Sequence, residues 1–373
     1  MPHPMTTTLP APTPVPNVDP EEAARSRRLW VAAIASALLA ATVLGAVFLP
    51  VPYVTLRPGQ VRPVTEHVLV EGAPSYEPEE SIAFTTVNVG SATLIEALQG
   101  WLDDDVDVLP EERVRGGRSA AENRRYNAQL MDTSKLVAMT VALRHLGHEV
   151  AISTTGVVVR QIVEGSPAEA VLQIDDVIVA IDGEAVDELD EVGRLLQAGG
   201  PGASHVLTVE RPPGGTDTVE LDIATIASPD DAERAVIGIV PEDRIAGFDF
   251  PFAVTIDSGP VGGPSAGLAF TLAVLDVLTP GELTGGHRVA VTGTMHLDGT
   301  VGPVGGAAQK AVSVRNAGYE AFLVPSDEFD EVKASVGTSL TVIAVDTLAE
   351  ALEALDSLGG NAGSVAGPAE VGG

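Results

Sequence analysis

An uninterrupted apolar run near the N-terminus constrains the fold of this chain more than any other feature. Leu29–Leu49 contains 21 residues without a charged side chain, and Pro50 follows it directly. A helix of about 20 apolar residues spans the roughly 30 Å hydrocarbon core of a bilayer. The alternative is a cleaved signal peptide, whose apolar region is normally about 7–15 residues long and ends in an A-x-A-like site. The run therefore predicts a retained transmembrane helix at residues 29–49.

The residues before this run predict its orientation. Arg25, Arg27 and Arg28 precede it, and positively charged flanks stay on the cytoplasmic side of a membrane. Residues 1–28 are rich in proline and show no apolar periodicity, so we expect a disordered cytoplasmic tail. Everything after Pro50 would then lie on the extracytoplasmic side of the cell membrane.

The composition limits the chemistry and the partners of the chain. Its 52 acidic and 21 basic residues give a formal net charge of -31, so binding to nucleic acid is not expected. Cysteine is absent, which excludes disulfides, thiolate nucleophiles and cysteine-ligated zinc. His145 and His148 lie close together without a carboxylate motif, so neither a metal nor a cofactor is expected. Only three lysines occur, so a lysine in an apolar setting is informative.

The pattern after the apolar run predicts a multi-domain protein. Residues 53–150 form a mixed α/β segment that we expect to pack with the C-terminal domain. Residues 151–226 are expected to form a β domain with short helices, and residues 227–358 an α/β (α+β) domain. The Gly- and Ala-rich residues 359–373 are expected to be disordered.

The stretch Gly156–Val186 carries a recognisable order of turns and strands. Ser166-Pro167-Ala168 begins a short helix, Asp176-Val177-Ile178 begins a strand, and Asp182-Gly183 forms a turn. This order resembles a bacterial PDZ domain, with Asp175 standing where the family usually has glycine.

The PDZ resemblance implies a peptide-binding groove. Val192–Leu196 would be the groove helix, and a peptide C-terminus would bind as an added strand. We expect the carboxylate-binding loop just upstream of the domain, at Leu146, Gly147, His148 and Val150. A packed β domain that binds nothing is the alternative.

A glycine-rich segment, Gly259–Phe270 (GPVGGPSAGLAF), points to a nucleophile. Its glycines allow close approach of the backbone to a ligand, and Pro264 suits a first helical position. Ser265 then lies beside free N–H groups and the positive end of a helix dipole, which can stabilise an oxyanion. Candidate donors are the N–H groups of Gly262, Gly263 and Ala266. A simple glycine-rich cap is the alternative.

A lysine lies on an apolar helical stripe further along the chain. Ala307, Lys310, Ala311 and Val314 share one face of a helix predicted to begin at Gly306. Lysine is rarely buried without a partner or a function. Burial lowers the lysine pKa and makes a neutral amine available as a general base. Snorkelling of the amine to solvent is the alternative.

Together the two segments are more specific than either alone. Gly263–Ala269 is followed by Val291-Thr292-Gly293, then by Gly299–Gly306, and then by Lys310. This order resembles the proteolytic domain of Lon-type serine–lysine peptidases over residues 227–357. The resemblance implies Ser265 as nucleophile, Lys310 as general base and Thr292 as the residue that orients the lysine. Gly262 stands where many members have Asp, which removes an acidic contribution there and leaves the dyad intact.

The whole arrangement resembles the membrane-anchored, PDZ-containing Lon-like serine proteases of bacteria. It implies protein or peptide substrates and, because Lon-type domains usually form rings, a homo-oligomer. No G-x-x-x-x-G-K-[ST] motif occurs, so proteolysis independent of ATP is expected. The alternative is a catalytically inactive, membrane-tethered PDZ scaffold.

Two other serine motifs are present and are disfavoured. Asp257-Ser258-Gly259-Pro260 is similar to the D-S-G of trypsin-like proteases but lacks their flanking glycines and a matching histidine. Gly263-x-Ser265-x-Gly267 also matches an esterase elbow, with His287 or His296 downstream. An α/β-hydrolase needs several strands before the elbow and more chain after it.

Overall fold

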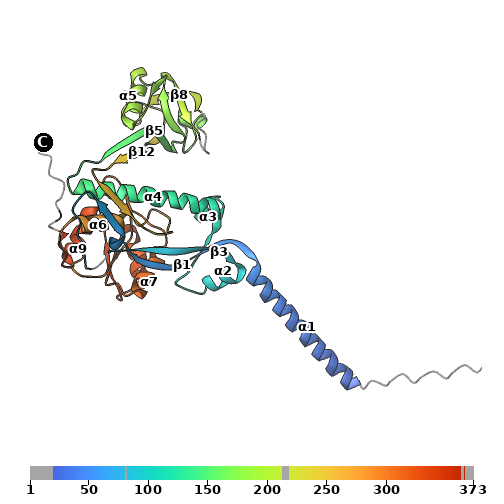
Figure 1. Ribbon diagram of the computed structural model, residues 1–373. Coiled ribbons are helices and arrows are strands. Elements are labelled where there is room, and N and C mark those ends of the chain that lie inside the picture. The colour runs from blue at the N-terminus through green and yellow to red at the C-terminus, as the bar shows by residue number, and fades with distance from the viewer. Residues whose placement is uncertain (1–19, 80–81, 212–217, 363–364, 366–373) are drawn as a thin grey trace, which may run out of the picture.

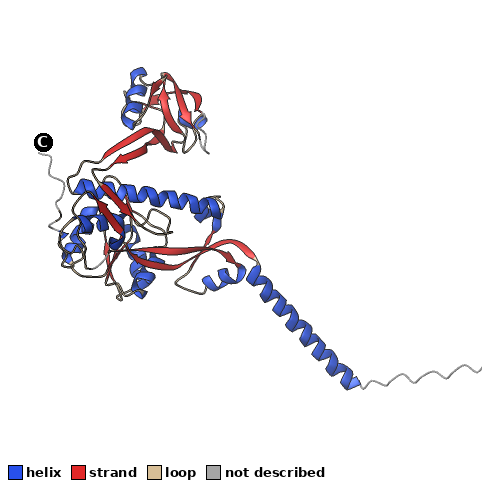
Figure 2. Cartoon of the chain, viewed as in Figure 1, coloured by secondary structure: helices blue, strands red, loops and turns tan. Residues whose placement is uncertain are grey.

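The computed structural model describes residues 20–79, 82–211, 218–362 and 365, and its first element is a long helix. Helix α1 (Pro20–Phe48) projects away from two sheet-containing parts (Figures 1 and 2). Its segment Ala24–Phe48 is long and apolar enough to cross a membrane, a criterion that a signal sequence also meets, and none of it is buried within the chain. Of the tail expected at residues 1–28, residues 1–19 lie outside the described residues, and residues 20–28 are helical.

The larger part is built on a mixed six-stranded sheet with the order β18-β17-β14-β3-β1-β4. The strands β3, β14, β17 and β18 run parallel to one another, whereas β1 pairs antiparallel with β3 and β4. In chain order they are β1 (Pro50–Pro63), β3 (Ala83–Thr93), β4 (Asp107–Pro110), β14 (Val289–Val291), β17 (Ala321–Val324) and β18 (Thr341–Ala344).

After α1 the described residues form eight α-helices, and seven of these belong to the larger part. These seven are α2 (Leu94–Gly100), α3 (Glu111–Arg115), α4 (Ala120–His145), α6 (Gly267–Leu278), α7 (Ala307–Asn316), α8 (Phe329–Val336) and α9 (Leu348–Ser357). Every residue of α6 from Gly267 to Val277 is buried, as its lack of a polar face predicts. Two ribbons complete this part, namely β2 (Val68–Glu71) with β13 (Ala253–Ile256), and β15 (Thr294–Met295) with β16 (Val301–Gly302).

Two segments that are distant in the sequence share the core of the larger part. Strand β3 pairs with β14, with Phe84 opposite Val291, and the Phe84 ring packs edge-on against Phe270 of α6 at 5.6 Å. Helix α4 packs against α6, and residues of both segments belong to one buried cluster. Residues 53–150 and residues 250–358 therefore form one sheet and one core together.

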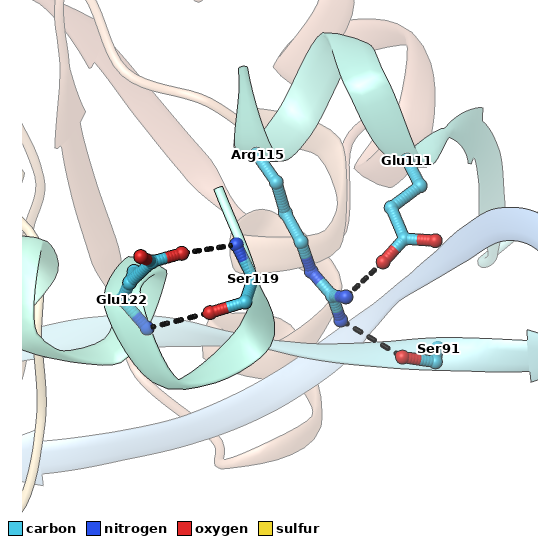
Figure 3. Close-up of polar contacts among 5 residues, drawn as sticks. All are labelled: Ser91, Glu111, Arg115, Ser119 and Glu122. Carbon is cyan, nitrogen blue, oxygen red and sulfur yellow. Dashed lines mark hydrogen bonds and ion pairs between the residues drawn. The ribbon is translucent and has the colours of Figure 1, made fainter. Parts of the chain in front are cut away.

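Side-chain contacts fix the start of α4 and its neighbour α3 (Figure 3). Arg115 of α3 bonds to Glu111 one turn earlier and donates to the Ser91 hydroxyl of β3 over 2.8 Å. Ser119 caps α4 by accepting from the Glu122 N–H, while the Glu122 carboxylate accepts from the Ser119 N–H. This reciprocal cap satisfies two helix-end N–H groups at once. The run of arginines and glutamates at 113–125 is thus a capped and largely helical surface.

The smaller part is an antiparallel sheet with the order β12-β5-β6-β8-β9, to which β7 adds by pairing with β6. Helix α5 (Leu189–Gly199) packs against it, and the pair β10–β11 lies beside this helix. The strands are β5 (Ala151–Ile162), β6 (Val177–Ile181), β7 (Glu184–Ala185), β8 (Ser204–Glu210), β9 (Thr218–Ala224), β10 (Ile226–Ala227), β11 (Ala235–Val236) and β12 (Ile239–Asp249).

The structure corrects two boundaries. The β domain does not end at residue 226, because β12 returns to pair with β5 as far as Asp249 opposite Ala151, and Ile237 lies in the β-domain core. The tail at 359–373 is not disordered at its start. The Asn361 N–H donates to the Glu282 oxygen over 3.0 Å, and Ala362 and Val365 are buried in the core of the larger part.

Candidate active site

The predicted nucleophile and base meet in the structure. The Lys310 Nζ atom of α7 lies 2.9 Å from the Ser265 Oγ atom, which stands just before α6. Gly306, in the left-handed region at φ 66°, is the N-cap of α7, and its backbone oxygen accepts from the Lys310 N–H over 3.0 Å. All four residues of the predicted apolar stripe, Lys310 included, are buried. The contact is short enough for direct proton transfer between the two groups.

Burial makes Lys310 a competent base. Its side chain is 2% exposed, and desolvation lowers the pKa of the Lys310 amine to about 7, while the negative charge of Glu328 acts in the opposite direction. No carboxylate forms an ion pair with Lys310 among the residues that the structure describes. A large fraction of this amine is therefore neutral at neutral pH and can accept the Ser265 proton.

Thr292 ties the two groups to the sheet. Its Oγ1 atom accepts a hydrogen bond from Lys310 Nζ over 3.0 Å and donates to the Ser265 backbone oxygen over 3.1 Å. The next residue, Gly293, donates its N–H to that same oxygen over 2.9 Å. Thr292 is fully buried directly after β14, so one residue at the end of a sheet strand contacts both members of the dyad.

Helix α4 holds the glycine-rich segment before Ser265. The Asn127 backbone oxygen accepts from the Gly263 N–H over 2.7 Å, and the Ser134 hydroxyl donates to the Pro264 oxygen over 3.0 Å. A Cβ atom at Gly262 would lie 2.9 Å from the Asn127 Cβ atom, so glycine is required there. Neither α4 residue could be predicted, because nothing in the sequence pattern linked 120–145 to the serine.

This contact changes the set of oxyanion donors. Gly263 was a candidate, but its N–H is already used by Asn127, so that part of the prediction is wrong for this conformation. Across the described residues, the N–H groups of Gly262 and Ala266 have no hydrogen-bond acceptor. These two, together with the Ser265 N–H, remain the candidate donors for an oxyanion.

A buried acidic group that the sequence analysis did not identify, Glu328, lies near the lysine. The Glu328 carboxylate accepts from the Val304 N–H over 3.2 Å, and its Oε2 atom has no hydrogen-bond partner within the described residues. Burial raises the pKa of Glu328. Its position in the acidic run Ser326–Glu331 made it indistinguishable from solvent-exposed neighbours.

The two disfavoured serine motifs have no histidine hydrogen-bonded to their serine among the described residues. Ser258 donates only to the oxygen of the adjacent Gly259, and Asp257 accepts from the Gly259 N–H, as in a tight turn. His287 bonds to Glu320 at the surface. Within the part of the chain that the structure describes, no histidine, His296 included, is hydrogen-bonded to Ser258 or Ser265, so neither the trypsin-like nor the esterase-like arrangement is formed.

The smaller part carries a groove with a volume of about 850 Å³. Its walls come from α5, from the start of β12 and from the turn at 163–166. Strand β12 is the edge of its sheet and pairs with β5 on one side only. The groove therefore has the form that strand addition requires, an open sheet edge facing a helix.

The predicted carboxylate-binding loop is not part of this groove. Leu146, Gly147, His148 and Val150 follow α4, where Leu146 packs on the core of the larger part and the His148 ring meets Phe252 at 5.2 Å. That prediction is wrong. The segment Val236–Ile239 lines the groove at the start of β12 instead, with Gly238 at φ 82°. An Ile-Gly-Ile sequence just before a strand was the available signal.

Comparisons with known proteins agree with the division of the chain into a larger and a smaller part. Residues 249–356 match the Lon protease (S16) C-terminal proteolytic domain, and residues 158–211 match the PDZ domain. Lon protease 1 of Sorangium cellulosum (strain So ce56) is 36% identical over 124 residues, which are 32% of this chain and 15% of that protein. The Lon protease of Campylobacter concisus (strain 13826) is 32% identical over 110 residues, which are 28% of this chain and 13% of that protein.

The matches cover only part of each relative. This chain spans 13 to 15% of the length of these two Lon proteases. A solved PDZ domain, that of the SdrC-like protein from Listeria monocytogenes, aligns at 24% identity over 24% of this chain and 92% of its own, with a TM-score of 0.22. The chain thus contains a PDZ domain and a domain of the Lon protease (S16) C-terminal proteolytic family.

Proposed function

We propose that this protein is a serine endopeptidase whose nucleophile is Ser265 and whose general base is Lys310. The observation that carries the proposal is the buried Lys310 amine, 2.9 Å from the Ser265 hydroxyl, with a pKa lowered to about 7. A desolvated amine beside a hydroxyl at a helix start fits nucleophilic catalysis better than a structural role, because burying a lysine is costly.

The chemistry follows from these groups. The neutral Lys310 amine takes the Ser265 proton while the serine oxygen attacks a peptide carbonyl carbon. The resulting oxyanion is stabilised by backbone N–H groups at Gly262, Ser265 and Ala266. Collapse of this intermediate breaks the peptide bond, the protonated lysine gives its proton to the leaving amine, and water then hydrolyses the acyl-enzyme.

The proposal extends to location and energy source. Helix α1 is a retained membrane span with its N-terminus in the cytoplasm, so both domains lie outside the cell membrane. The chain cleaves accessible polypeptides without ATP, since its sequence carries no phosphate-binding P-loop. The active form is a homo-oligomer, which analytical ultracentrifugation of the full chain in detergent would test.

The dyad is tested with the full chain, an unfolded protein substrate and no ATP, with mass spectrometry of the products. Ser265→Ala and Lys310→Ala are expected to abolish cleavage. Ser258→Ala and Lys333→Ala are the matched controls, because they remove the same groups away from the site, and they are expected to cleave as the wild type does. If Lys310→Ala cleaves as the wild type does, the dyad is wrong. If the wild type, like Ser265→Ala, cleaves nothing, the chain is a scaffold.

The PDZ groove is proposed to recruit the polypeptide that the dyad cleaves. Gly193 of α5 lines the groove and has open space where a Cβ atom would lie, so Gly193→Phe fills the groove without disturbing the helix. The exposed Ala198 of the same helix does not line it, so Ala198→Phe is the control. We expect Gly193→Phe to slow cleavage of a recruited protein about tenfold and to leave cleavage of a short peptide unchanged. Equal rates for both variants on every substrate would remove the recruitment role.

A further inference from the structure

The outward face of α2 is apolar and exposed. Leu98, Trp101 and Leu102 are spaced i, i+3 and i+4, and the backbone remains helical at Trp101, so they share one face. They are 46%, 58% and 89% exposed. On the adjoining side of the helix Ala97 is buried and Gly100 packs closely against β4. Helix α2 therefore packs one side on the sheet and leaves a second apolar side open.

This open face lies at the end of the candidate membrane span. The Leu94 N–H, the first of α2, donates to the Leu49 oxygen directly after α1 over 2.9 Å. The two helices contact each other, and Figure 1 shows α2 beside the C-terminal end of α1. Phe48 and Leu49 at that end are exposed as well. The apolar surface of α1 thus continues onto α2.

The geometry keeps the open face near the level of lipid headgroups. A seven-residue helix is about 10 Å long, and the polar layer on each side of the hydrocarbon core is about 5–7 Å thick. Because α2 begins where α1 ends, its face cannot rise far above that layer. Tryptophan and tyrosine are enriched at this level, and here the Tyr53 ring packs edge-on against Trp101 at 5.9 Å.

We propose that Leu98, Trp101 and Leu102 insert into the headgroup region of the bilayer that α1 spans. Helix α2 then lies on the membrane surface and fixes the height and tilt of the proteolytic domain, to which it is joined through β1 and β3. The inference rests on the proposed membrane span. Asp103, Asp104 and Asp105 follow α2 directly, so the contact is apolar and the lipid it fits is zwitterionic rather than anionic.

The chain is well suited to a fluorescence test, since it contains two tryptophans, Trp30 in α1 and Trp101. The full chain with Trp30→Phe is reconstituted in phosphatidylcholine vesicles that carry a quenching group either near the headgroup or deep in the acyl chain. We expect Trp101 emission to be quenched at least twofold more by the shallow group. A chain with Trp30→Phe, Trp101→Phe and Ile174→Trp places a lone tryptophan at an exposed PDZ-domain position and should be quenched by neither group.

The Trp101→Phe variant keeps Trp30 and reports on α1 separately. Quenching of Trp30 without quenching of Trp101 would overturn the contact of α2 while leaving the membrane span in place. Quenching of neither would remove the span itself, and the inference with it. A third outcome would also overturn the proposal. If Trp101 is not quenched by the lipid groups, and is shielded from aqueous iodide only at a high protein-to-lipid ratio, a second copy of the chain covers α2.

Discussion

The Nζ atom of Lys310 lies 3.0 Å from the Oγ1 atom of Thr292, whose own proton is donated to the Ser265 backbone oxygen over 3.1 Å. One buried hydroxyl therefore positions the base through its lone pair and the nucleophile through its proton. Because it acts through other groups, Thr292 is a positioning residue in the proposed mechanism.

Replacement of Thr292 by an isosteric apolar residue should uncouple the dyad. In Thr292→Val the lysine loses an acceptor and the Ser265 oxygen loses a donor, and a misplacement of about 1 Å can cost about 100-fold in rate. We expect kcat to fall by about that factor with KM little changed, in assays of peptide cleavage. Thr292→Ser keeps the hydroxyl and should restore most of kcat. Failure of the serine variant to rescue would indicate that packing, not the hydroxyl, matters.

The pH dependence should report the lysine directly. Its pKa is lowered to about 7 by burial, and only the neutral amine accepts the serine proton. The fraction of neutral amine grows with pH, so kcat/KM should rise through pH 7 and level off above about pH 8. Lys310→Arg, which stays charged at every accessible pH, should be inactive across the profile. A wild-type profile that stays flat from pH 6 to 9 would contradict this role for Lys310.

Glu328 should set the pH at which kcat/KM rises, that is, the position of the acidic limb of the pH profile. Its negative charge raises the pKa of Lys310, so Glu328→Gln removes a stabilising influence on the protonated lysine. We expect the limb to move to lower pH by about one unit or less, which makes the variant relatively more active at pH 6 than the wild type. The amide oxygen can still accept from the Val304 N–H. Asp330→Asn removes an equal charge at an exposed position of α8, and its profile should superimpose on that of the wild type.

The proteolytic core was predictable from local pattern where the pattern was unambiguous. The largely apolar segment 268–278 shows no polar face, which is typical of a buried helix, and Ala307, Ala311 and Val314 placed Lys310 on a buried face, as the structure has it. The short apolar segment Ala321–Val324 is likewise strand-like in sequence and forms β17.

The errors involve partners far apart in the chain. Strand β12 belongs to the PDZ sheet because it pairs with β5, and the two strands begin 88 residues apart, at Ala151 and Ile239. No local pattern encodes that register. The same is true of Asn127, whose backbone oxygen accepts from the Gly263 N–H from the N-terminal third of α4. A backbone acceptor leaves no trace in the sequence, so this contact could only be seen in the structure.

The contact between α4 and the nucleophile segment gives the last prediction. Ser134 donates to the Pro264 oxygen, one residue before the nucleophile, so Ser134→Ala should loosen that segment and lower kcat about tenfold. It should also cost about 1 kcal/mol of stability, as the loss of one hydrogen bond does. Ser119→Ala, which removes the cap of the same helix (Figure 3), should cost about 1 kcal/mol as well but leave kcat unchanged. Urea unfolding and peptide cleavage measured on both variants separate the two effects. If the two variants lose stability equally and activity equally, α4 contributes only to folding and does not position the nucleophile.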